Sequence, residues 1–452
     1  MRDVDWEAVG EEATTLLQDL VRINTTNPPG NETAAASCLA ELLAREGLRP
    51  GVVEPEPGRG SLTCRLLGSG ERGEPLLLLS HLDVVGVERD KWERDPFSGE
   101  LAEGYVWGRG ALDCKGLTVM EVMVLLLLWR NGERLGRDVI LAATADEETG
   151  GRLGAGWLVS NRPDLVDAPH VINEGGGHGV ALGGRKLYTC QVGEKGRCRF
   201  RVTARGSAGH ASRPASDNSV LLMGHVLQRL GAMRMPARVT RTVQEFVRIT
   251  AAGQPPEIAG VLEKLAQGCE VSPEEASLLP DGLAEELWAL TRDTLSPTIL
   301  RAGEKINVIP SEASVWVDAR LVPGSDPDVF AARVCEELSS VGDRVELEVT
   351  DAGPGLEADP DSELYRCMAD AIAQEDPGAV LVPFLSTGGT DAKHLCRKSG
   401  VRVYGFMPIR PDPCAPRGSL VHGHNERISV ENLVFGVRVL YNAVRRFCAQ
   451  PG

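Results

Sequence analysis

The chain has 452 residues and 42% of them are hydrophobic, so it can bury a large core as two or more domains or as one large elaborated domain. Its net charge is −16, from 64 acidic and 48 basic residues, and no run is rich in Lys and Arg. We therefore expect a globular protein that binds neither nucleic acid nor an anionic membrane surface.

The cysteines and the N-terminus indicate the compartment in which such a protein works. The eleven cysteines are scattered and include no Cys-x-x-Cys pair, which argues against a zinc ribbon or a disulfide scaffold and favours a reducing compartment. The first residues lack the apolar core of a signal peptide. The most apolar run, 119–129, contains Glu121 and is about half the length that a bilayer requires. These features predict a cytoplasmic protein.

The first part of the chain alternates between helical and extended patterns. Apolar residues recur at helical spacing over 6–23, and a second helix is predicted over 31–46. Residues 62–67 and 76–80 are predicted to form adjacent strands. The second of these is a run of leucines without helical spacing, which is typical of a strand buried on both faces. This alternation indicates an α/β fold.

The same pattern continues with a buried helix at 117–130 and two more buried strands at 139–145 and 170–173. Open α/β sheets bind ligands in the crevice outside the carboxyl ends of their strands. The residues that follow these strands are therefore candidates for a functional site.

Imidazole and carboxylate side chains stand at these strand ends. His81 follows the strand of leucines, and Glu174 follows the third strand. Between them in the chain, Glu147 and Glu148 follow the second strand, and Asp113 lies in a glycine-rich loop before the buried helix. Neighbouring residues of a regular strand face opposite sides, so both glutamates can serve one site only if the chain bends there. The two glycines that follow them make such a bend plausible.

The pair His81 and Asp83 has the spacing of a supported metal ligand. In an extended chain, side chains two residues apart point the same way. An imidazole with a carboxylate behind it is the arrangement of a metal-ligating histidine whose second ring nitrogen is held by an acid. In isolation, such a pair is more often a histidine at a strand end followed by an aspartate in a turn.

The acids and the histidine at the strand ends, together with Asp113, would suit a pair of divalent ions. Such a pair needs roughly four to six protein ligands, including a carboxylate that can bridge. One further histidine is required, and His422 and His424 lie in a glycine-flanked loop near the C-terminus. Spacing alone does not choose between these two histidines.

A second type of pattern begins at residue 193. Arginines alternate with apolar residues after 196, which is typical of a strand with one solvated face. The expected elements that follow are a helix at 217–231, strands at 298–300, 305–309 and 314–321, a helix at 326–339 and a strand at 345–349. Apart from one additional short strand between the two helices, this is the β-α-β-β-α-β order of a ferredoxin-like domain. It carries an insertion at about 236–296, an irregular region with acidic helical pieces.

The α/β pattern resumes after residue 361, with a helix at 361–375 and a strand at 379–384. We therefore predict a catalytic domain made of 1–192 and 353–452, into which a smaller domain, 193–352, is inserted.

Several of these motifs together resemble one family of enzymes. They are the strand that ends in His81-x-Asp83, the loop 108–116, the run Asp146-Glu147-Glu148 and the segment 207–212. In these motifs the chain resembles the family of aminoacylase, carboxypeptidase G, acetylornithine deacetylase and succinyl-diaminopimelate desuccinylase. The match extends from the turn at Asn27 to the last helix. The insertion in the smaller domain resembles the longer lids of the carboxypeptidase S and N-fatty-acyl amino acid hydrolase branch.

The resemblance implies a mixed-sheet, zinc-peptidase-like catalytic domain with an inserted α+β lid, and two bound Zn²⁺ ions that Co²⁺ or Mn²⁺ could replace. Asp83 would orient the first histidine, and Glu147 would be the general base. Carried over by motif, the metal ligands would be His81, Asp113, Glu148, Glu174 and His424, with Asp113 as the bridge.

The resemblance also assigns roles in the lid. His210 would donate a hydrogen bond to the oxyanion, and Asn307 and Arg320 would hold the substrate, because a guanidinium binds a carboxylate in bidentate fashion. Gly389 and Thr390 would belong to a loop that closes over the same end of the substrate. The family allows a homodimer through the lid, and the insertion would cover or enlarge the surface that forms it.

These assignments predict a metal-dependent hydrolase of N-acyl-L-amino acids or of short peptides with a free carboxylate. A dizinc-bridging hydroxide would attack the amide carbonyl, with Glu147 as general base. A dipeptidase or carboxypeptidase, or a deacylase of the acetylornithine or succinyl-diaminopimelate type, is the alternative. A binding protein without chemistry is less consistent with the sequence, because it would not need Glu147.

Overall fold

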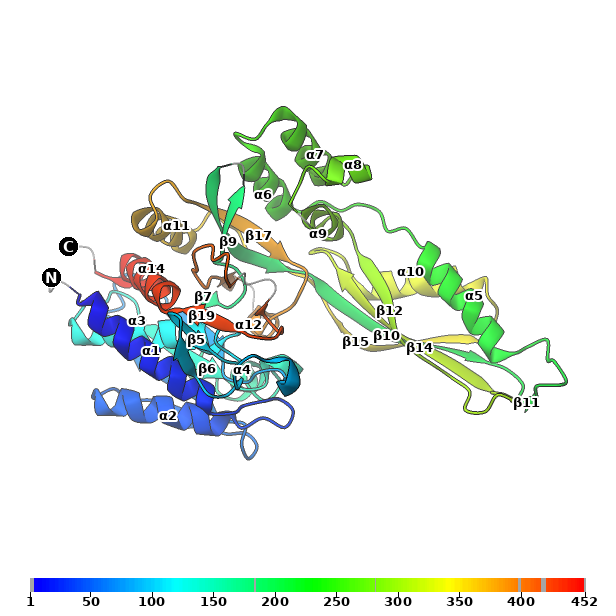
Figure 1. The fold of residues 1–452 in the computed structure, drawn as a ribbon, viewed down its shortest axis with the longest axis horizontal. Coiled ribbons are helices and arrows are strands. Elements are labelled where there is room, and N and C mark those ends of the chain that lie inside the picture. Colours follow the sequence, from blue (N-terminus) through cyan, green and yellow to red (C-terminus); the bar gives the residue numbers. More distant parts are fainter. Residues whose placement is uncertain (1–3, 183, 281, 397–399, 416–419, 451–452) are drawn as a thin grey trace. The chain divides into compact units, whose positions relative to one another are not determined.

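The computed structural model describes residues 4–182, 184–280, 282–396, 400–415 and 420–450 (Figure 1). The chain divides into two compact units: unit 1 consists of Met1–Val192, Ala358–Phe384 and Thr390–Gly452, and unit 2 of Gly193–Glu357 and Leu385–Gly389. Unit 2 begins where the sequence places the inserted domain. It extends past the expected end at 352 and takes in a second short segment.

A mixed sheet forms the centre of unit 1. In spatial order its strands are β1 (Gly51–Val53), β2 (Ser61–Leu66), β6 (Val139–Thr144), β3 (Leu76–His81), β7 (His170–Asn173), β18 (Arg402–Gly405) and β9 (Arg185–Glu194), and β8 (Gly179–Leu182) and β17 (Val380–Ser386) also pair with β9. The strands β6, β3, β7 and β18 are parallel, whereas β1 and β2 pair antiparallel. The expectation that β2 and β3 are adjacent is wrong. β6, which is buried along its whole length, lies between them and so has a partner on each edge.

The long helices of unit 1 pack around this sheet (Figure 1). They are α1 (Trp6–Arg22), α2 (Glu32–Arg45), α3 (Lys115–Arg130), α11 (Glu363–Glu375) and α14 (Val430–Cys448). α3 is apolar on all sides and almost completely buried, in contact with β3, β6, α1 and α14. Asp5 caps α1 by accepting hydrogen bonds from the main-chain N–H groups of Glu7 and Ala8. The helices α1 and α14, from the two ends of the chain, contact each other, and both contact α3.

A small sheet brings two distant loops of unit 1 together. Its strands, in spatial order, are β19 (Arg427–Ser429), β5 (Tyr105–Trp107) and β4 (Glu100–Ala102). β19 pairs with β5, so the glycine-rich loop after Trp107 lies beside the loop that precedes Arg427. These strands have three residues each, too few for a periodic pattern, and the sequence analysis did not predict them.

Unit 2 contains a four-stranded antiparallel sheet in the order β12-β14-β10-β15. Its elements are β10 (Gly196–Arg205), α5 (Ser219–Ala232), β12 (Thr294–Ala302), β14 (Glu312–Leu321), α10 (Pro327–Ser339) and β15 (Val345–Gly353). The expected β-α-β-β-α-β order is therefore present and gives a ferredoxin-like arrangement. Apolar residues of one sheet face form a core with α5 and α10, while the arginines of β10 form ion pairs with acids of β14 and β15.

The segment between α5 and β12 is more helical than expected. It forms α6 (Arg241–Ala251), α7 (Pro256–Ala266), α8 (Pro273–Ala276) and α9 (Leu283–Leu290). The predicted strand at 305–309 is reduced to β13 (Val308–Ile309), which pairs with β11 (Gly209–His210) outside the four-stranded sheet. Within the described parts of the chain, none of the helices combines the length and the apolar character needed to cross a bilayer.

Candidate metal centre and active site

The carboxyl ends of three parallel strands lie side by side in unit 1. β3 runs between β6 and β7, and the register places His81 opposite Thr144 at the end of β6. From there the chain enters a short helical turn, Glu147–Thr149. β7 ends at Asn173, directly before Glu174. The predicted site residues of these strands therefore leave the sheet at one edge, where parallel sheets bind ligands.

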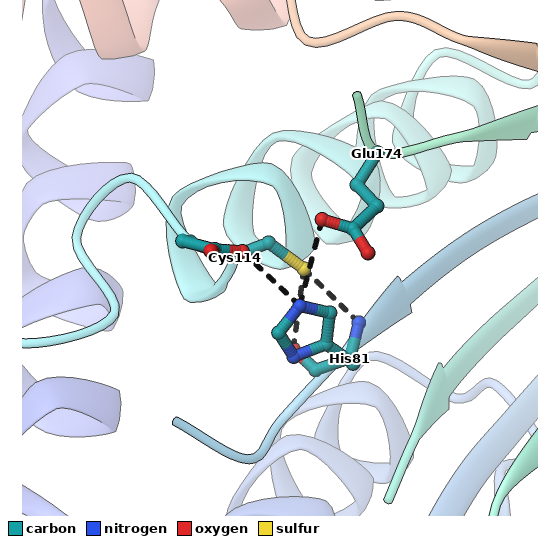
Figure 2. A group of neighbouring side chains, drawn as sticks. His81, Cys114 and Glu174 are labelled. Atoms are coloured by element: carbon teal, nitrogen blue, oxygen red, sulfur yellow. Dashed lines mark hydrogen bonds and ion pairs between the residues drawn. The ribbon is translucent and has the colours of Figure 1, made fainter. Parts of the chain in front are cut away.

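His81 is the centre of a first group of candidate metal ligands (Figure 2). Its side chain is 2% exposed, and its Nε2 lies 3.2 Å from Oδ1 of Asp113 and 3.6 Å from Oε2 of Glu174. Its other ring nitrogen, Nδ1, lies 3.4 Å from Oδ1 and 3.0 Å from the main-chain oxygen of Asp83. One nitrogen thus faces two carboxylates while the other is held from behind, which is how a metal-ligating histidine is oriented in proteins.

Asp113 also belongs to a second group of candidate ligands. Its Oδ2 lies 3.1 Å from Nε2 of His422, and the same nitrogen lies 3.2 Å from Oε2 of Glu148. The two oxygens of Asp113 therefore face different histidines. The other oxygen of Glu148, Oε1, is buried and has no hydrogen-bond partner among the described residues. Within each group the donor atoms lie within 4.8 Å of one another, so Asp113 connects two candidate cation sites.

The histidine of the second group is His422, and the assignment of that position to His424 is corrected. Nε2 of His424 lies 3.0 Å from Oε2 of Glu88, and its side chain is exposed. The backbone of His422 is left-handed, with φ of 57°, and so is that of Asn425, with φ of 60°. These two turns place the first histidine of the loop at the site and direct the second one away from it. Residue spacing does not contain that information.

Asp83 links His81 to the turn that carries the two glutamates. Its carboxylate accepts hydrogen bonds from the main-chain N–H of Glu147 at 3.1 Å and from that of Glu148 at 3.0 Å. Asn27 donates to it from Nδ2 at 2.8 Å. The turn begins at Asp146, whose φ of 73° takes the chain out of the strand direction. The expected bend is therefore present, and the carboxylate of Asp83 holds the main chain at both glutamates.

Glu147 lies beside the two ligand groups and, among the described residues, belongs to neither. Burial raises the pKa of Glu147 well above its ordinary value, and the charges of Glu174 and Asp391 raise it further. Its Oε1 lies 3.7 Å from Nζ of Lys393, a neighbour that the sequence analysis missed. A buried carboxylate with a raised pKa beside candidate metal ligands is suited to general base catalysis near neutral pH.

Negative charge dominates the electrostatics of the site. Hydrogen bonds to two carboxylates raise the pKa of His422 to about 10. Burial alone would lower the pKa of His81, but the neighbouring carboxylates of Glu174, Asp113 and Asp83 raise it well above its ordinary value. A positive charge on these imidazoles would offset the clustered carboxylates, and divalent cations would offset them more completely.

Cys114 also belongs to the first group of candidate ligands, and the sequence analysis did not single it out (Figure 2). Its Sγ accepts a hydrogen bond from the main-chain N–H of His81 at 3.1 Å. Burial raises the pKa of its thiol, and a neutral buried thiol is inert. Its contact with β3 helps to fix the end of the strand that presents His81.

Comparison with known proteins identifies the family to which this site belongs. Residues 77–446 match the model of peptidase family M20/M25/M40. The chain belongs to this family. The resemblance found in the sequence is thus confirmed, and the protein is a metal-dependent hydrolase with a candidate His/Asp/Glu metal centre.

Individual relatives and structures agree with this family. The chain is 26% identical over 444 residues to aminoacylase-1A of Rattus norvegicus, covering 97% of this chain and 96% of the relative. It is 29% identical over 378 residues to the N-fatty-acyl-amino acid synthase/hydrolase PM20D1 of Xenopus tropicalis, covering 81% and 71% of the two chains. The fold is similar to that of the M20 family metallo-carboxypeptidase Sso-CP2 from Sulfolobus solfataricus, with a TM-score of 0.73, 19% identity, and coverage of 96% and 99%. It is also similar to the YXEP protein of Bacillus subtilis, a dinuclear metal binding peptidase, with a TM-score of 0.60, 13% identity, and coverage of 97% and 98%.

The lid residues suggested by the M20 resemblance lie in unit 2. His210 is exposed on β11, with Nδ1 2.7 Å from Oγ of Ser212. Asn307 lies directly before β13, the strand that pairs with β11, and its main-chain oxygen accepts a hydrogen bond from the N–H of Ala211 at 3.0 Å. Arg320, on β14, donates from Nε to Asp318, a neighbour on the same strand, at 2.6 Å.

The predicted closing loop spans the boundary between the units. Gly389 is exposed and belongs to unit 2, whereas Thr390 is buried in unit 1. Oγ1 of Thr390 accepts a hydrogen bond from Nδ2 of Asn173 at 3.0 Å, directly before Glu174. Asn173 is thus a supporting residue of the centre that the sequence analysis missed, although it ends a predicted strand.

A buried polar network behind Asp83 was also missed. Arg59 donates from Nη2 to Asp146 at 2.9 Å, and the same nitrogen lies 2.9 Å from Oε1 of Glu32. From Nη1 it donates to Oδ1 of Asn27 at 3.1 Å, and Asn27 in turn holds Asp83. Asn27 stands in the Pro- and Gly-containing turn that is part of the family resemblance. Arg59 stands in a segment without periodicity, so no sequence signal marks it.

Proposed function

We propose that this M20 protein hydrolyses the amide bond of N-acyl-L-amino acids, or of short peptides with a free carboxylate, with two zinc ions. The spacing of the candidate ligands carries this proposal. Ligands about 2.0–2.1 Å from a tetrahedral zinc ion lie roughly 3.3 Å from one another. The contacts of His81 and His422 with their carboxylates measure 3.2, 3.6, 3.1 and 3.2 Å.

Each ion would have its own ligands and share one carboxylate. His81 and Glu174 would hold the first ion, Glu148 and His422 the second, and Asp113 would bridge them. The unpartnered Oε1 of Glu148 supports this assignment, because a buried carboxylate oxygen without a donor is costly unless a cation meets it. The mixed nitrogen and oxygen donor set suits zinc and would also accept cobalt or manganese.

When bound, such ions supply an activated water and polarise the amide carbonyl oxygen. The carboxylate of Glu147 takes a proton from the attacking water and delivers it to the leaving amine nitrogen. Lys393, 3.7 Å from that carboxylate, favours the ionised form in which it can accept the proton. Asp83 keeps the ring of His81 and the main chain at Glu147 in place during these steps.

The residues proposed to hold the substrate come mainly from unit 2. Arg320 and Asn307 would bind the free carboxylate, since a guanidinium offers two parallel donors. Arg320 now donates to Asp318, so the substrate carboxylate would share or replace that contact. His210 would donate a hydrogen bond to the oxyanion that forms at the carbonyl.

A substrate panel tests the proposal. The protein, supplied with zinc or cobalt, is offered N-acetyl, N-succinyl and long-chain N-acyl amino acids and dipeptides, and the released amine is measured. Glu147→Gln should retain two ions and lose roughly 10²–10⁴-fold in turnover. Glu88→Gln, which changes an exposed carboxylate paired with His424 and Lys91, is the control that should keep turnover. Unchanged turnover in Glu147→Gln excludes this base, and a panel without any hydrolysed member excludes the substrate class.

We further propose a homodimer through unit 2 and a cytoplasmic location. β12 is an edge strand, and Ile299 and Leu300 on it are 48% and 56% exposed, which favours association with another strand. Ile299→Lys should convert a dimer, measured by light scattering, into a monomer. All eleven cysteines are free thiols, as expected in a reducing compartment.

A further inference from the structure

A buried ion pair connects the loop that carries Asp113 with the loop that carries His422. Nη1 of Arg109 donates to Oε2 of Glu426 at 2.6 Å, and the two side chains are 2% and 0% exposed. Among the described residues, neither side chain belongs to a candidate ligand group. Removing two charges from water is costly, and further hydrogen bonds are needed to offset that cost. This pair makes them to the main chain of the two loops.

Glu426 fixes the main chain that leads to Asp113. Its Oε1 accepts hydrogen bonds from the N–H groups of Gly110 at 3.1 Å, Leu112 at 2.8 Å and Asp113 at 3.0 Å. Its main-chain oxygen accepts a fourth from the N–H of Gly108 at 2.9 Å. A carboxylate that accepts several main-chain hydrogen bonds holds the loop around it in one conformation. The position from which Asp113 extends is thus set by a residue far along the chain.

Arg109 fixes the main chain at His422. Its Nη2 donates to the main-chain oxygen of Gly423 at 2.8 Å and to that of His422 at 3.4 Å. The guanidinium also lies 5.2 Å from the centre of the Trp92 ring, which restricts its plane. One rigid group therefore binds Glu426 with one nitrogen and the His422 turn with another.

His422 needs this support more than His81 does. The side chain of His81 is 2% exposed, so the surrounding atoms confine it, whereas that of His422 is 53% exposed. A half-exposed imidazole owes its position mainly to its main chain. At His422 that main chain is left-handed, with φ of 57°, a conformation that residues other than glycine seldom adopt without help from their surroundings.

We infer that Arg109 and Glu426 are positioning residues that set the span between Asp113 and His422, and thereby the affinity of the second ligand group for its cation. The inference rests on the proposed function, because it supposes that each group binds an ion. Among the described residues, neither Arg109 nor Glu426 forms a hydrogen bond or ion pair with His81 or Glu174, which belong to the first group alone. Because Arg109 contacts the turn of His422, which belongs to the second group alone, loss of Arg109 should weaken the second ion much more than the first.

Arg109→Lys tests the inference, because lysine keeps the charge and loses the planar fork. Arg137→Lys is the matched control: Arg137 is also buried, donates to Glu363 at 2.8 Å and to the main-chain oxygen of Phe447 at 3.2 Å, and stacks on an aromatic ring. Metal-free proteins are titrated with Co²⁺ and followed by calorimetry and visible absorption. Wild type and Arg137→Lys should bind two ions alike. Arg109→Lys should bind the first ion as wild type does and the second about 10–100-fold more weakly.

The outcomes separate this inference from the proposed function. If wild type binds fewer than two ions, the proposed dinuclear function is overturned, and the inference with it. If wild type binds two ions and Arg109→Lys binds both with unchanged affinity, the inference alone is overturned. Glu426→Gln keeps the side-chain shape and removes the charge that holds the loop of Asp113, and because Asp113 belongs to both groups it should weaken both ions; unchanged affinity for the second ion would overturn the inference.

Hydrogen exchange of metal-free wild type tests the inference without any substitution, and so decides the matter if the variants do not fold. The amides of Gly110, Leu112 and Asp113 should be strongly protected before metal is added, since Glu426 holds them in the protein itself. Exchange as fast as that of an exposed loop would overturn the inference.

Discussion

Replacing Asp83 with Asn would remove the carboxylate that joins the two halves of the centre. Both of its oxygens face donors: Oδ1 accepts from the N–H of Glu147, and Oδ2 accepts from Glu148 and Asn27. An Asn side chain offers only one accepting atom, so at least one buried donor would meet an NH₂ group instead. Leaving a buried donor unpaired costs about 1–3 kcal/mol. The orientation that keeps both donors at Oδ2 sacrifices the hydrogen bond from Glu147 and the contact of Oδ1 with Nδ1 of His81. We therefore expect Asp83→Asn to lose about 1–3 kcal/mol of folding free energy.

Metal binding should report the same substitution independently. The carboxylate behind Nδ1 of His81 orients the ring, and loss of such a partner weakens metal binding about 10–100-fold. Calorimetric titration of the metal-free variant with Co²⁺ measures this loss, and urea unfolding followed by circular dichroism measures stability. Asp19→Asn, which removes an exposed carboxylate paired with Arg22, is the control and should stay within about 0.5 kcal/mol of wild type. If Asp83→Asn matches that control in both measurements, the organising role of Asp83 is refuted.

Other predictions address the remaining parts of the centre. His422→Ala should lose one bound ion by elemental analysis, whereas His424→Ala should keep both; the reverse result would restore the original assignment. Chelation should lower the urea midpoint, because clustered carboxylates then repel, and added zinc should restore it. Arg320→Lys should raise KM for substrates with a free carboxylate more than it lowers kcat; equal KM would exclude the proposed contact. Burial raises the pKa of Glu121 well above 4.5, so the folded chain keeps a proton that the unfolded chain loses, and wild-type stability falls as pH rises above 4.5. Unfolding measured across pH should show Glu121→Gln gaining on wild type by up to about 1.4 kcal/mol per pH unit; a constant difference would show that Glu121 is ionised in the fold.

The strand ends were predictable because burial leaves a strong signal in this sequence. The leucines before His81 and the strands before Glu147 and Glu174 lack the alternating polar residues of a strand with one solvated face, which is typical of a parallel sheet covered on both faces. In such a sheet the residues after the strands meet at one edge. The ferredoxin-like order of unit 2 was predictable for a similar reason, since alternation along β10 marks a sheet with one solvated face.

The rest depends on contacts that have no periodicity. Choosing His422 over His424 requires the left-handed turn of a loop, and that turn depends on its hydrogen bonds to a distant arginine. The placement of β6 between β2 and β3 depends on which edges remain to be paired once the sheet forms. Cys114 lies in the loop 108–116 that carries the family resemblance, but a single cysteine there predicts no role, and Lys393 joins the centre only through its contact with Glu147.

The order in which the ligands occur along the chain has a consequence for biosynthesis. His81, Asp113 and Glu174 have all been translated before any residue of unit 2 leaves the ribosome, whereas His422 follows it and stands close to α14. A nascent chain would thus possess the proposed ligands of one ion long before those of the other. Loading of the second position, and with it the onset of activity, would have to wait until synthesis is nearly finished.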